Sequence, residues 1–409
     1  MSDTSRAIKN LKAIAAVLVV SFHSSLAYVS SQPAVSEAFN QPPYRWLATA
    51  VLDPHRWLGF DIYAAFLYVG LMPLMFFMSG IFVWGSLVRK GTKRYLVGRI
   101  LRIGLPFALG VYLFMPFGYY PAYALRTPDA SWLGYWHAFL KLPFWPSGPL
   151  WFLWELLAFD LAASLLYIVA PGFVRPLQRL GAAGERPARY FIIMIAVSAL
   201  AYVPLALAFG ASHWTEFGPF ALQADRVLLY AVYFFAGVGI GVHGYERGLM
   251  AAGGALARGW RIWTLAAVLT FFAWMGSMAP SFYGYGSTLL DIVSALALTV
   301  AVAAGCFGFL AVFLRFCTRD VVALNSLAQH AYAIYLIHYP FVVWLQFALF
   351  GSALPAAAKA ALVFSGALFV SWAIAAGFGR CTALLRNVRP RDARFTTPTP
   401  LEKSRLGTS

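Results

Sequence analysis

Two ionisable residues interrupt the first apolar run of the chain, LKAIAAVLVVSFHSS at residues 11–25. Lys12 and His23 are eleven residues apart, so on an α-helix they lie within about 20° of each other and about 16 Å apart along the axis. Ionisable groups at that depth in an apolar helix usually face a bundle interior or a wet cavity. A neutral His23 there has the chemistry of a general base. A hydrogen bond to a neighbouring helix, with Lys12 as a topology signal, accounts for the pattern equally well.

Two arginines follow the second apolar run, after a cationic loop. Arg99 and Arg102 are three residues apart and share a helix face. Guanidinium groups suit bidentate phosphate binding, and we expect a helix to begin here and to add its N-terminal donors and dipole. The pair predicts a site for a phosphate-rich ligand that arrives from the cytoplasm. Simple retention of positive charge on the cytoplasmic side is the alternative.

Two acids lie in GPLWFLWELLAFDLAA, residues 148–163. Glu155 and Asp160 are five residues apart, or about 140° around a helix, so they cannot form a carboxylate pair without partners from elsewhere. Glu155 could orient an imidazole or bind a sugar hydroxyl. An interhelical hydrogen bond or ion pair is the alternative.

A late apolar run, LNSLAQHAYAIYLIHYPFVVWLQ at residues 324–346, holds two further histidines. His330 and His338 are about 80° apart on a helix and do not share a narrow stripe. His338 precedes Pro340, which frees a backbone carbonyl. Polar packing between helices is the alternative to a role in the site. A weaker signal comes from polar residues around a predicted loop, which could touch a polar acceptor: His213, Glu216, Asp225 and Arg226.

The elements that position these residues are apolar helices. Of the 409 residues, 61% are hydrophobic and 11% charged, whereas soluble domains carry about 25% charged residues. Backbone polar groups in lipid need internal partners, so the apolar runs predict an all-α, polytopic bundle in the bilayer. We expect residues 1–380 to form the transmembrane domain and 381–409 a disordered cytoplasmic tail. About ten spans are predicted, near residues 10–30, 60–86, 100–120, 149–170, 190–210, 225–243, 261–280, 287–314, 329–350 and 357–380.

Charge sets the predicted orientation of the bundle. With the N-terminus in the cytoplasm, 25 of the 31 Lys and Arg residues lie on the cytoplasmic side, which predicts that both termini are cytoplasmic. Two predicted outer loops, near residues 31–58 and 121–148, are rich in Pro, Trp and Tyr. Their aromatics belong either to the interfacial belt or to a site that faces outward.

Several classes of function find no support in the pattern. The net charge of +16 comes without a basic tract interleaved with aromatics, so nucleic acid is not an expected partner. The chain has no phosphate-binding glycine loop, no metal-ligand spacing and no nucleophile elbow. The two halves show no matching broken helices of the kind that mark many transporters. The first span lacks a cleavage site, and no disulfide is expected from Cys306, Cys317 and Cys381.

In their order along the chain, these features resemble the acyltransferase-3 family of integral membrane acyltransferases. Lys12 and His23 hold the positions of the family's Arg, ten residues and His, and Arg99 and Arg102 match its Arg-x-x-Arg. FFMSG (76–80) looks like its second-span motif, and AYAIYLIHYP (331–340) is similar to its Ser-Tyr-x-x-Tyr-x-x-His run, with Ala331 in place of Ser. WFLWE is similar to a looser Trp-and-Glu motif.

The resemblance implies a chemistry and a set of roles. Acyl-CoA would bind from the cytoplasm as the donor substrate at Lys12, Arg99 and Arg102, without a tightly bound cofactor or a metal. His23 would act as catalytic base, with Glu155 and His338 in the catalytic site. An acetyl or succinyl group would pass to a hydroxyl of an extracytoplasmic carbohydrate, in the bacterial inner membrane.

Three points stay open. The chain is also similar to the glucan biosynthesis protein C-type succinyltransferases of the family, so either acyl group fits. Lys12 is a point charge without the planar fork of the family's Arg. A multi-pass transporter or flippase of a glycan or other polar solute would also place polar residues at the midplane.

Overall fold

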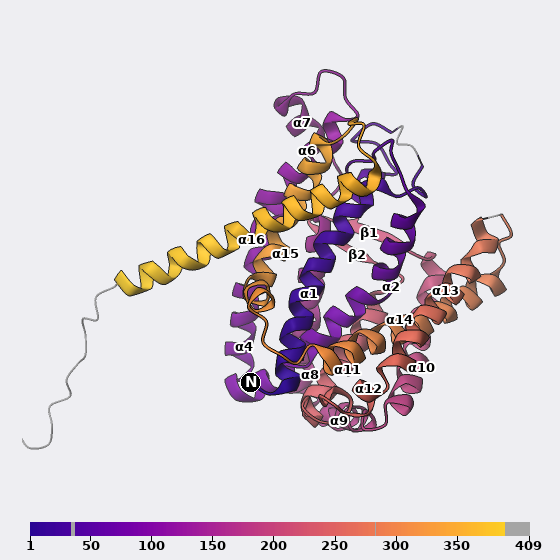
Figure 1. Cartoon of the computed structure of the whole chain (residues 1–409), viewed down its shortest axis with the longest axis vertical. Helices are drawn as coiled ribbons and strands as arrows, with labels where there is room; N and C mark the ends of the chain where they lie inside the picture. The colour runs from indigo at the N-terminus through magenta and orange to yellow at the C-terminus, as the bar shows by residue number, and fades with distance from the viewer. Residues whose placement is uncertain (34–36, 283, 389–409) are drawn as a thin grey trace, which may run out of the picture.

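The computed structural model describes residues 1–33, 37–282 and 284–388. In these ranges the chain is mostly helical (Figure 1). Within the described part of the chain, nine helical stretches are long and apolar enough to cross a membrane, and α11 is a further, shorter apolar helix. This confirms the prediction of an all-α polytopic bundle.

The main helices outside the third span are α1 (Asp3–Ser25), α2 (Leu58–Gly80), α3 (Val83–Lys90), α7 (Trp132–Phe139), α8 (Trp151–Val169), α9 (Val174–Ala183), α10 (Pro187–Phe209), α11 (Val227–His243), α12 (Ala255–Arg258), α13 (Trp260–Phe282), α14 (Thr288–Phe316), α15 (Val322–Ala348) and α16 (Ala356–Val388).

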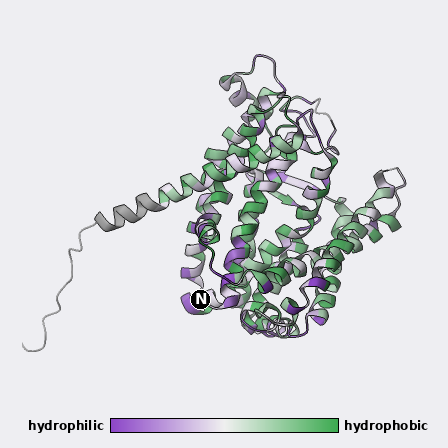
Figure 2. Ribbon diagram, viewed as in Figure 1, coloured by the Kyte–Doolittle hydropathy of each residue, from purple (hydrophilic) through white to green (hydrophobic). Residues whose placement is uncertain are grey.

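Helix α1 runs through the bundle and packs against α2, α14, α15 and α16 (Figure 1). Its first turn is capped by the Ser2 side chain, which accepts a hydrogen bond from the Ser5 amide. Hydrophobic residues cover most of the helices, and hydrophilic residues gather near the N-terminus (Figure 2). Following the predicted orientation, we call the end that holds the N-terminus the inner end and the opposite end the outer end.

The third span is one long helix, Thr92–Ala124, interrupted by two wide turns. It consists of α4 (Thr92–Arg99), α5 (Leu105–Leu109) and α6 (Met115–Ala124), joined by π-helical turns at Ile100–Gly104 and Gly110–Phe114. Arg99 and Arg102 therefore lie inside a helix that begins at Thr92. The expectation that they sit at a helix N-terminus is wrong, because the helix starts two turns earlier.

Helices α2 and α11 approach each other through glycines. A Cβ atom added to Gly80 would lie 2.0 Å from the Phe234 carbonyl oxygen, and one added to Gly237 would lie 2.0 Å from that of Phe77. Small residues let helix backbones come this close in membrane proteins, where packing and not hydrophobic exclusion holds helices together. This contact sets α2 and α11 as one wall of the bundle.

A short hairpin follows α10 at the outer end. Strand β1 (Trp214–Phe217) pairs antiparallel with β2 (Phe220–Gln223). The sequence pattern did not predict it, because each strand is only four residues long. The hairpin brings Glu216 and Gln223 to the same end of the bundle as the outer loops.

A buried ion pair ties α16 to the first outer loop. The Lys359 Nζ lies 2.9 and 2.8 Å from the two carboxylate oxygens of Asp53, and both side chains are inaccessible to solvent. The Asp53 amide in turn donates to the carbonyl of Ala27 just beyond α1. Helix α16 continues to Val388, so the predicted tail boundary at residue 381 falls within a helix; residues 389–409 lie outside the described residues.

Candidate active site

His23 and His338 meet at the outer half of the bundle, although they are 315 residues apart in sequence. The Nε2 atom of His338 lies 3.2 Å from Nδ1 of His23. His338, on α15, is fully buried, whereas His23, on α1, is partly exposed to a pocket. The ring of Tyr339 stands edge-on to His23 at 5.6 Å between centroids.

Backbone carbonyls define which ring nitrogens carry hydrogen. Nδ1 of His23 lies 2.8 Å from the Val19 carbonyl oxygen, and Nδ1 of His338 lies 2.8 Å from that of Tyr335. A carbonyl oxygen only accepts, so both Nδ1 atoms donate. The Nδ1–H of His23 is then shared with the bare Nε2 of His338. His23 keeps an unprotonated Nε2, to which no group among the described residues hydrogen-bonds.

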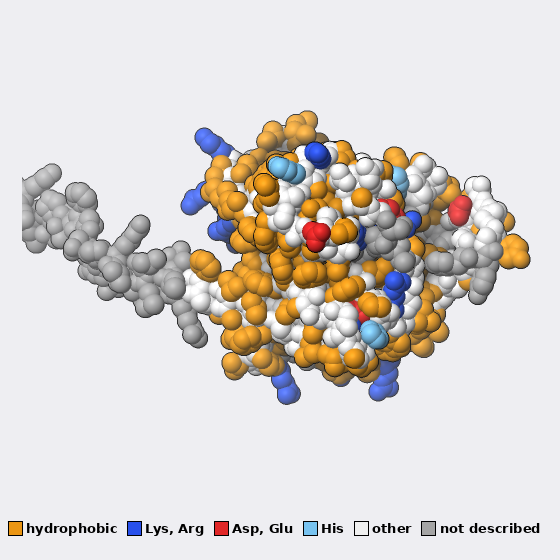
Figure 3. Space-filling model, turned by 90° about the horizontal axis from the view of Figure 1, so that it is seen from above, with side chains coloured by type: hydrophobic (Ala, Val, Ile, Leu, Met, Phe, Trp, Pro, Cys, Tyr) orange, Lys and Arg blue, Asp and Glu red, His pale blue; other side chains and the backbone are white. Residues whose placement is uncertain are grey.

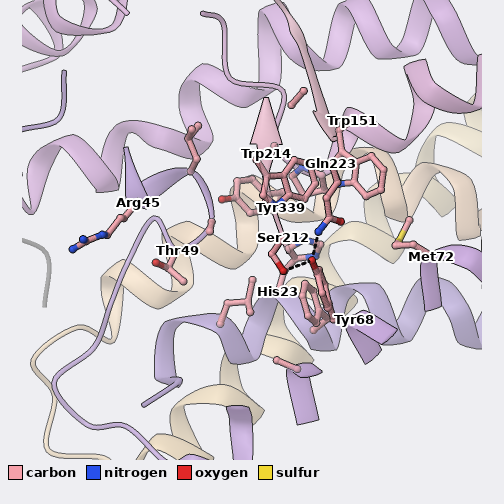
Figure 4. A pocket seen from close by; sticks show the side chains of 18 of the residues that line it. His23, Arg45, Thr49, Tyr68, Met72, Trp151, Ser212, Trp214, Gln223 and Tyr339 are labelled. Atoms are coloured by element: carbon pink, nitrogen blue, oxygen red, sulfur yellow. Dashed lines mark hydrogen bonds between the residues drawn. The ribbon is translucent and has the colours of Figure 1, made fainter. Parts of the chain in front are cut away.

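A pocket of about 680 Å³ opens beside His23. We call it the outer pocket; helices α1, α2, α8, α11 and α15, the hairpin and both outer loops supply its walls. Figure 4 shows Trp151, Trp214, Gln223 and Tyr339 around His23, with Arg45 set apart on a loop. The predicted outer loops therefore contribute to a site and not only to an interfacial belt. Its polar lining includes Asp61, Ser212, Glu216 and Gln223.

A second pocket, of about 660 Å³, lies at the inner end. This inner pocket is lined by Phe82 and four cations: Lys90, Arg94, Arg99 and Arg102. Lys12 approaches it from α1, with its Nζ 4.3 Å from the centroid of the Phe82 ring. Arg99 and Arg102 therefore line the inner pocket, and Lys12 contacts the Phe82 ring of its wall. Lys12 lies eleven residues before His23 on α1.

Asp160 holds Arg99 in place. Its Oδ2 lies 2.9 Å from Nε of Arg99, and its Oδ1 accepts a hydrogen bond of 2.6 Å from the Tyr95 hydroxyl. Nε of Arg99 also donates to the Tyr95 hydroxyl at 3.0 Å. No hydrogen bond or ion pair of the terminal nitrogens of Arg99 is found among the described residues, and Arg99 lines the inner pocket. An interhelical ion pair was the alternative predicted for the acids of this segment, and Asp160 forms one. The sequence did not identify Arg99 as its partner, because the two residues come from different helices.

Tyr332 reaches the same region from α15. Its hydroxyl donates to the backbone carbonyl of Arg102 at 2.6 Å. Arg102 lies in the first π-helical turn of the third span, where the regular helical ladder is disturbed. Tyr332 thus fastens α15 to the backbone that carries the arginine.

Glu155 contacts neither histidine among the described residues. Its side chain is 1% exposed, and neither carboxylate oxygen has a hydrogen-bond partner in the described part of the chain. It lies on α8 between Trp151 of the outer pocket and Asp160. Its predicted catalytic role stays a prediction. His330 also lies apart from the pair, two turns of α15 below His338.

The family of the chain can be stated from comparison with known proteins. A family model described as an acyltransferase domain, that of the acyltransferase-3 family, matches residues 5–376. No curated protein and no solved structure matches the chain. The matched range includes both histidines and every cation of the inner pocket. This chain belongs to the acyltransferase-3 family and is a multi-pass membrane acyltransferase.

Proposed function

We propose that this protein moves an acetyl or succinyl group from cytoplasmic acyl-CoA to a hydroxyl of a carbohydrate on the outer side of a bacterial inner membrane. The observation that carries the proposal is the His23–His338 pair. It leaves a basic Nε2 on His23 facing a pocket at the outer end. A neutral imidazole held in one tautomer is suited to remove a proton from an alcohol.

The inner pocket supports the choice of donor. Arg99 and Arg102 line it beside Lys90 and Arg94, and Lys12 stands at its edge. Four or five cations match the several phosphate charges of coenzyme A. The pantetheine arm of the donor is long enough to cover the length of α1 between Lys12 and His23, about 16 Å at 1.5 Å per residue.

The proposed reaction needs one base and no net proton exchange with the solvent. Nε2 of His23 takes the proton of the acceptor hydroxyl as its oxygen attacks the thioester carbonyl. The tetrahedral intermediate collapses, the C–S bond breaks, and the thiolate takes the proton back from the imidazolium. The products are the O-acyl ester and free coenzyme A thiol. His338 accepts the Nδ1–H hydrogen bond throughout and stabilises the transient imidazolium.

Release of free thiol tests the function directly. We expect purified protein in lipid nanodiscs to release coenzyme A thiol from acetyl-CoA or succinyl-CoA, faster when a glycan acceptor is present. Binding of both donors without any thiol release would favour a transporter and contradict the proposal. Comparison of the two donors identifies the acyl group.

A further inference from the structure

One face of the β1–β2 hairpin forms a wall of the outer pocket. Trp214 is paired with Gln223 across the strands, and Glu216 with Ala221. Directly opposed residues of an antiparallel pair point to the same face, so these four side chains share one side. All four line the outer pocket. The small Ala221 leaves space in front of Glu216.

The other face of the hairpin holds it against the bundle. Phe217 and Phe220 form the alternate cross-strand pair, and their rings lie 5.9 and 5.3 Å from that of Trp154 on α8. The Trp154 Nε1 donates to the Ala221 carbonyl at 2.8 Å. Because side chains alternate along each strand, one face of the hairpin packs on α8 (the anchoring face) and the other lines the outer pocket (the pocket face). Thr215 points to the anchoring side and does not line the pocket.

The pocket face is built from fixed groups. The Gln223 amide nitrogen donates to the Tyr68 hydroxyl, and its oxygen accepts from the Tyr230 hydroxyl at 3.1 Å. Tyr68 donates onward to Ser212 at 3.0 Å (Figure 4). The Trp214 ring is 38% exposed and stands edge-on to Trp151, with 5.3 Å between ring centroids. The flat aromatic surface of Trp214 therefore lies next to the hydrogen-bonded amide of Gln223.

Glu216 is the charged residue of this wall without an ion pair. No ion pair or side-chain hydrogen bond to its carboxylate is found among the described residues; burial raises its pKa above the ordinary range, and the attraction of His213 offsets only part of that rise. The other charged residues that line the pocket, Arg45 and Asp61, already have partners. Arg45 pairs with Glu37 at 3.0 Å, and Asp61 accepts the amides of Ser30 and Ser31 at 2.7 and 2.9 Å.

We propose that this face of the hairpin is the acceptor subsite and that it takes an uncharged sugar ring. The inference rests on the proposed function. Trp214 supplies a flat apolar surface for the ring, and Glu216 accepts hydrogen bonds from its hydroxyls, which are stronger to a charged oxygen than to a neutral one. A uronate or phosphorylated sugar at this position is rejected, because it would bring a second anion beside Glu216 with no unpaired cation among the lining residues.

Three variants test the platform. The assay measures acceptor-dependent thiol release with maltotriose, cellotriose and laminaritriose. Trp214→Ala is expected to raise the acceptor KM about tenfold, the scale of one lost aromatic contact, and more than it changes the KM for acyl-CoA. Trp214→Phe should retain most of the acceptor affinity. Thr215→Ala, on the other face of the same strand, is the matched control and should behave as the wild type.

Charge reversal tests the class of sugar. Wild-type protein should prefer the neutral trisaccharides to trigalacturonate. Glu216→Gln should raise the acceptor KM for the neutral sugars about tenfold, the size of a lost charge-assisted hydrogen bond. Glu216→Lys should shift the preference toward trigalacturonate.

The outcomes separate the inference from the function on which it rests. If acyl-CoA is never cleaved, the proposed function fails. If acyl-CoA is cleaved but trigalacturonate is the better acceptor, or no neutral sugar accelerates the reaction, the subsite assignment alone is overturned. It is equally overturned if Trp214→Ala and Thr215→Ala have the same acceptor KM.

Discussion

At the scale of single residues, the site depends on which ring nitrogen of each imidazole carries a hydrogen. Val19 and Tyr335 supply the carbonyls that fix the Nδ1–H of His23 and His338. Without His338, the Val19 carbonyl is the one hydrogen-bond partner left to the His23 ring among the described residues, and the orientation of the ring is less constrained. His338 is therefore a positioning residue, which acts on substrate through His23.

His338→Ala is expected to lower kcat about 100-fold, within the usual range for a disturbed general base, with little change in the KM for acyl-CoA. His330→Ala, on the same helix and away from the pair, is the matched control and should retain wild-type kcat. Steady-state thiol release measures both. Equal kcat in the two variants would show that the histidine contact has no part in the reaction.

By the resemblance described above, Lys12 holds the position of an Arg. Lys12→Arg should leave the KM for acyl-CoA unchanged or lower it, because Arg also stacks on Phe82 and adds a bidentate fork toward phosphate. Lys12→Met should raise that KM about tenfold, the loss expected for one charge-assisted contact. A marked loss of affinity in Lys12→Arg would mean that the site requires an ammonium group and that its phosphate role is wrong.

At the scale of elements, α1 and α15 connect the two pockets. Helix α1 carries Lys12 near one pocket and His23 in the other. Helix α15 fastens to the third span through Tyr332 and presents His338 two turns later. The relative positions of the two helices therefore set the distance from the cationic pocket to the base. The glycine contact of α2 with α11 holds the facing wall.

Gly237→Ala is expected to destabilise this wall, because its Cβ would lie 2.0 Å from the Phe77 carbonyl. Overpacking of this kind typically costs about 1–3 kcal/mol. Gly276→Ala is the control: it lies inside α13 with nothing within 4 Å of the added Cβ, so better helix propensity should make it neutral or slightly stabilising. Thermal unfolding of the detergent-purified proteins compares them. A Gly237→Ala protein as stable as the wild type would contradict this packing.

At the scale of the whole molecule, the two pockets lie at opposite ends of the bundle. The buried pair of Lys359 and Asp53 ties α16 to the loop that covers the outer pocket. Seen from the outer end, the surface mixes apolar, acidic, basic and histidine side chains (Figure 3). The charge bias along the chain predicts that the inner pocket faces the cytoplasm.

Sealed vesicles test this arrangement. Inside-out vesicles should consume external acyl-CoA, because their inner pocket faces the medium, whereas right-side-out vesicles should not until they are permeabilised. Free thiol in the medium is the measurement. Consumption of donor by intact right-side-out vesicles would reverse the predicted orientation.

Much of the bundle was predictable, because apolar runs of sufficient length indicate membrane spans. The fixed geometry of a helix also gives the positions of Lys12 and His23 relative to each other. The partners of these residues were not. His338 was expected only as a candidate, and its contact with His23 depends on how α1 and α15 pack. The pairing of Asp160 with Arg99 likewise joins two helices. The π-helical turns and the hairpin escaped prediction, because neither produces a long periodic pattern.

Removal and rescue of the base test the role of His23 directly. His23→Ala should lower acyl transfer to the glycan at least 100-fold, about the contribution of a general base, while the protein still inserts into the membrane. Added imidazole should enter the open outer pocket and restore part of the lost activity. Near-normal transfer by His23→Ala without imidazole would show that His23 is not the catalytic base.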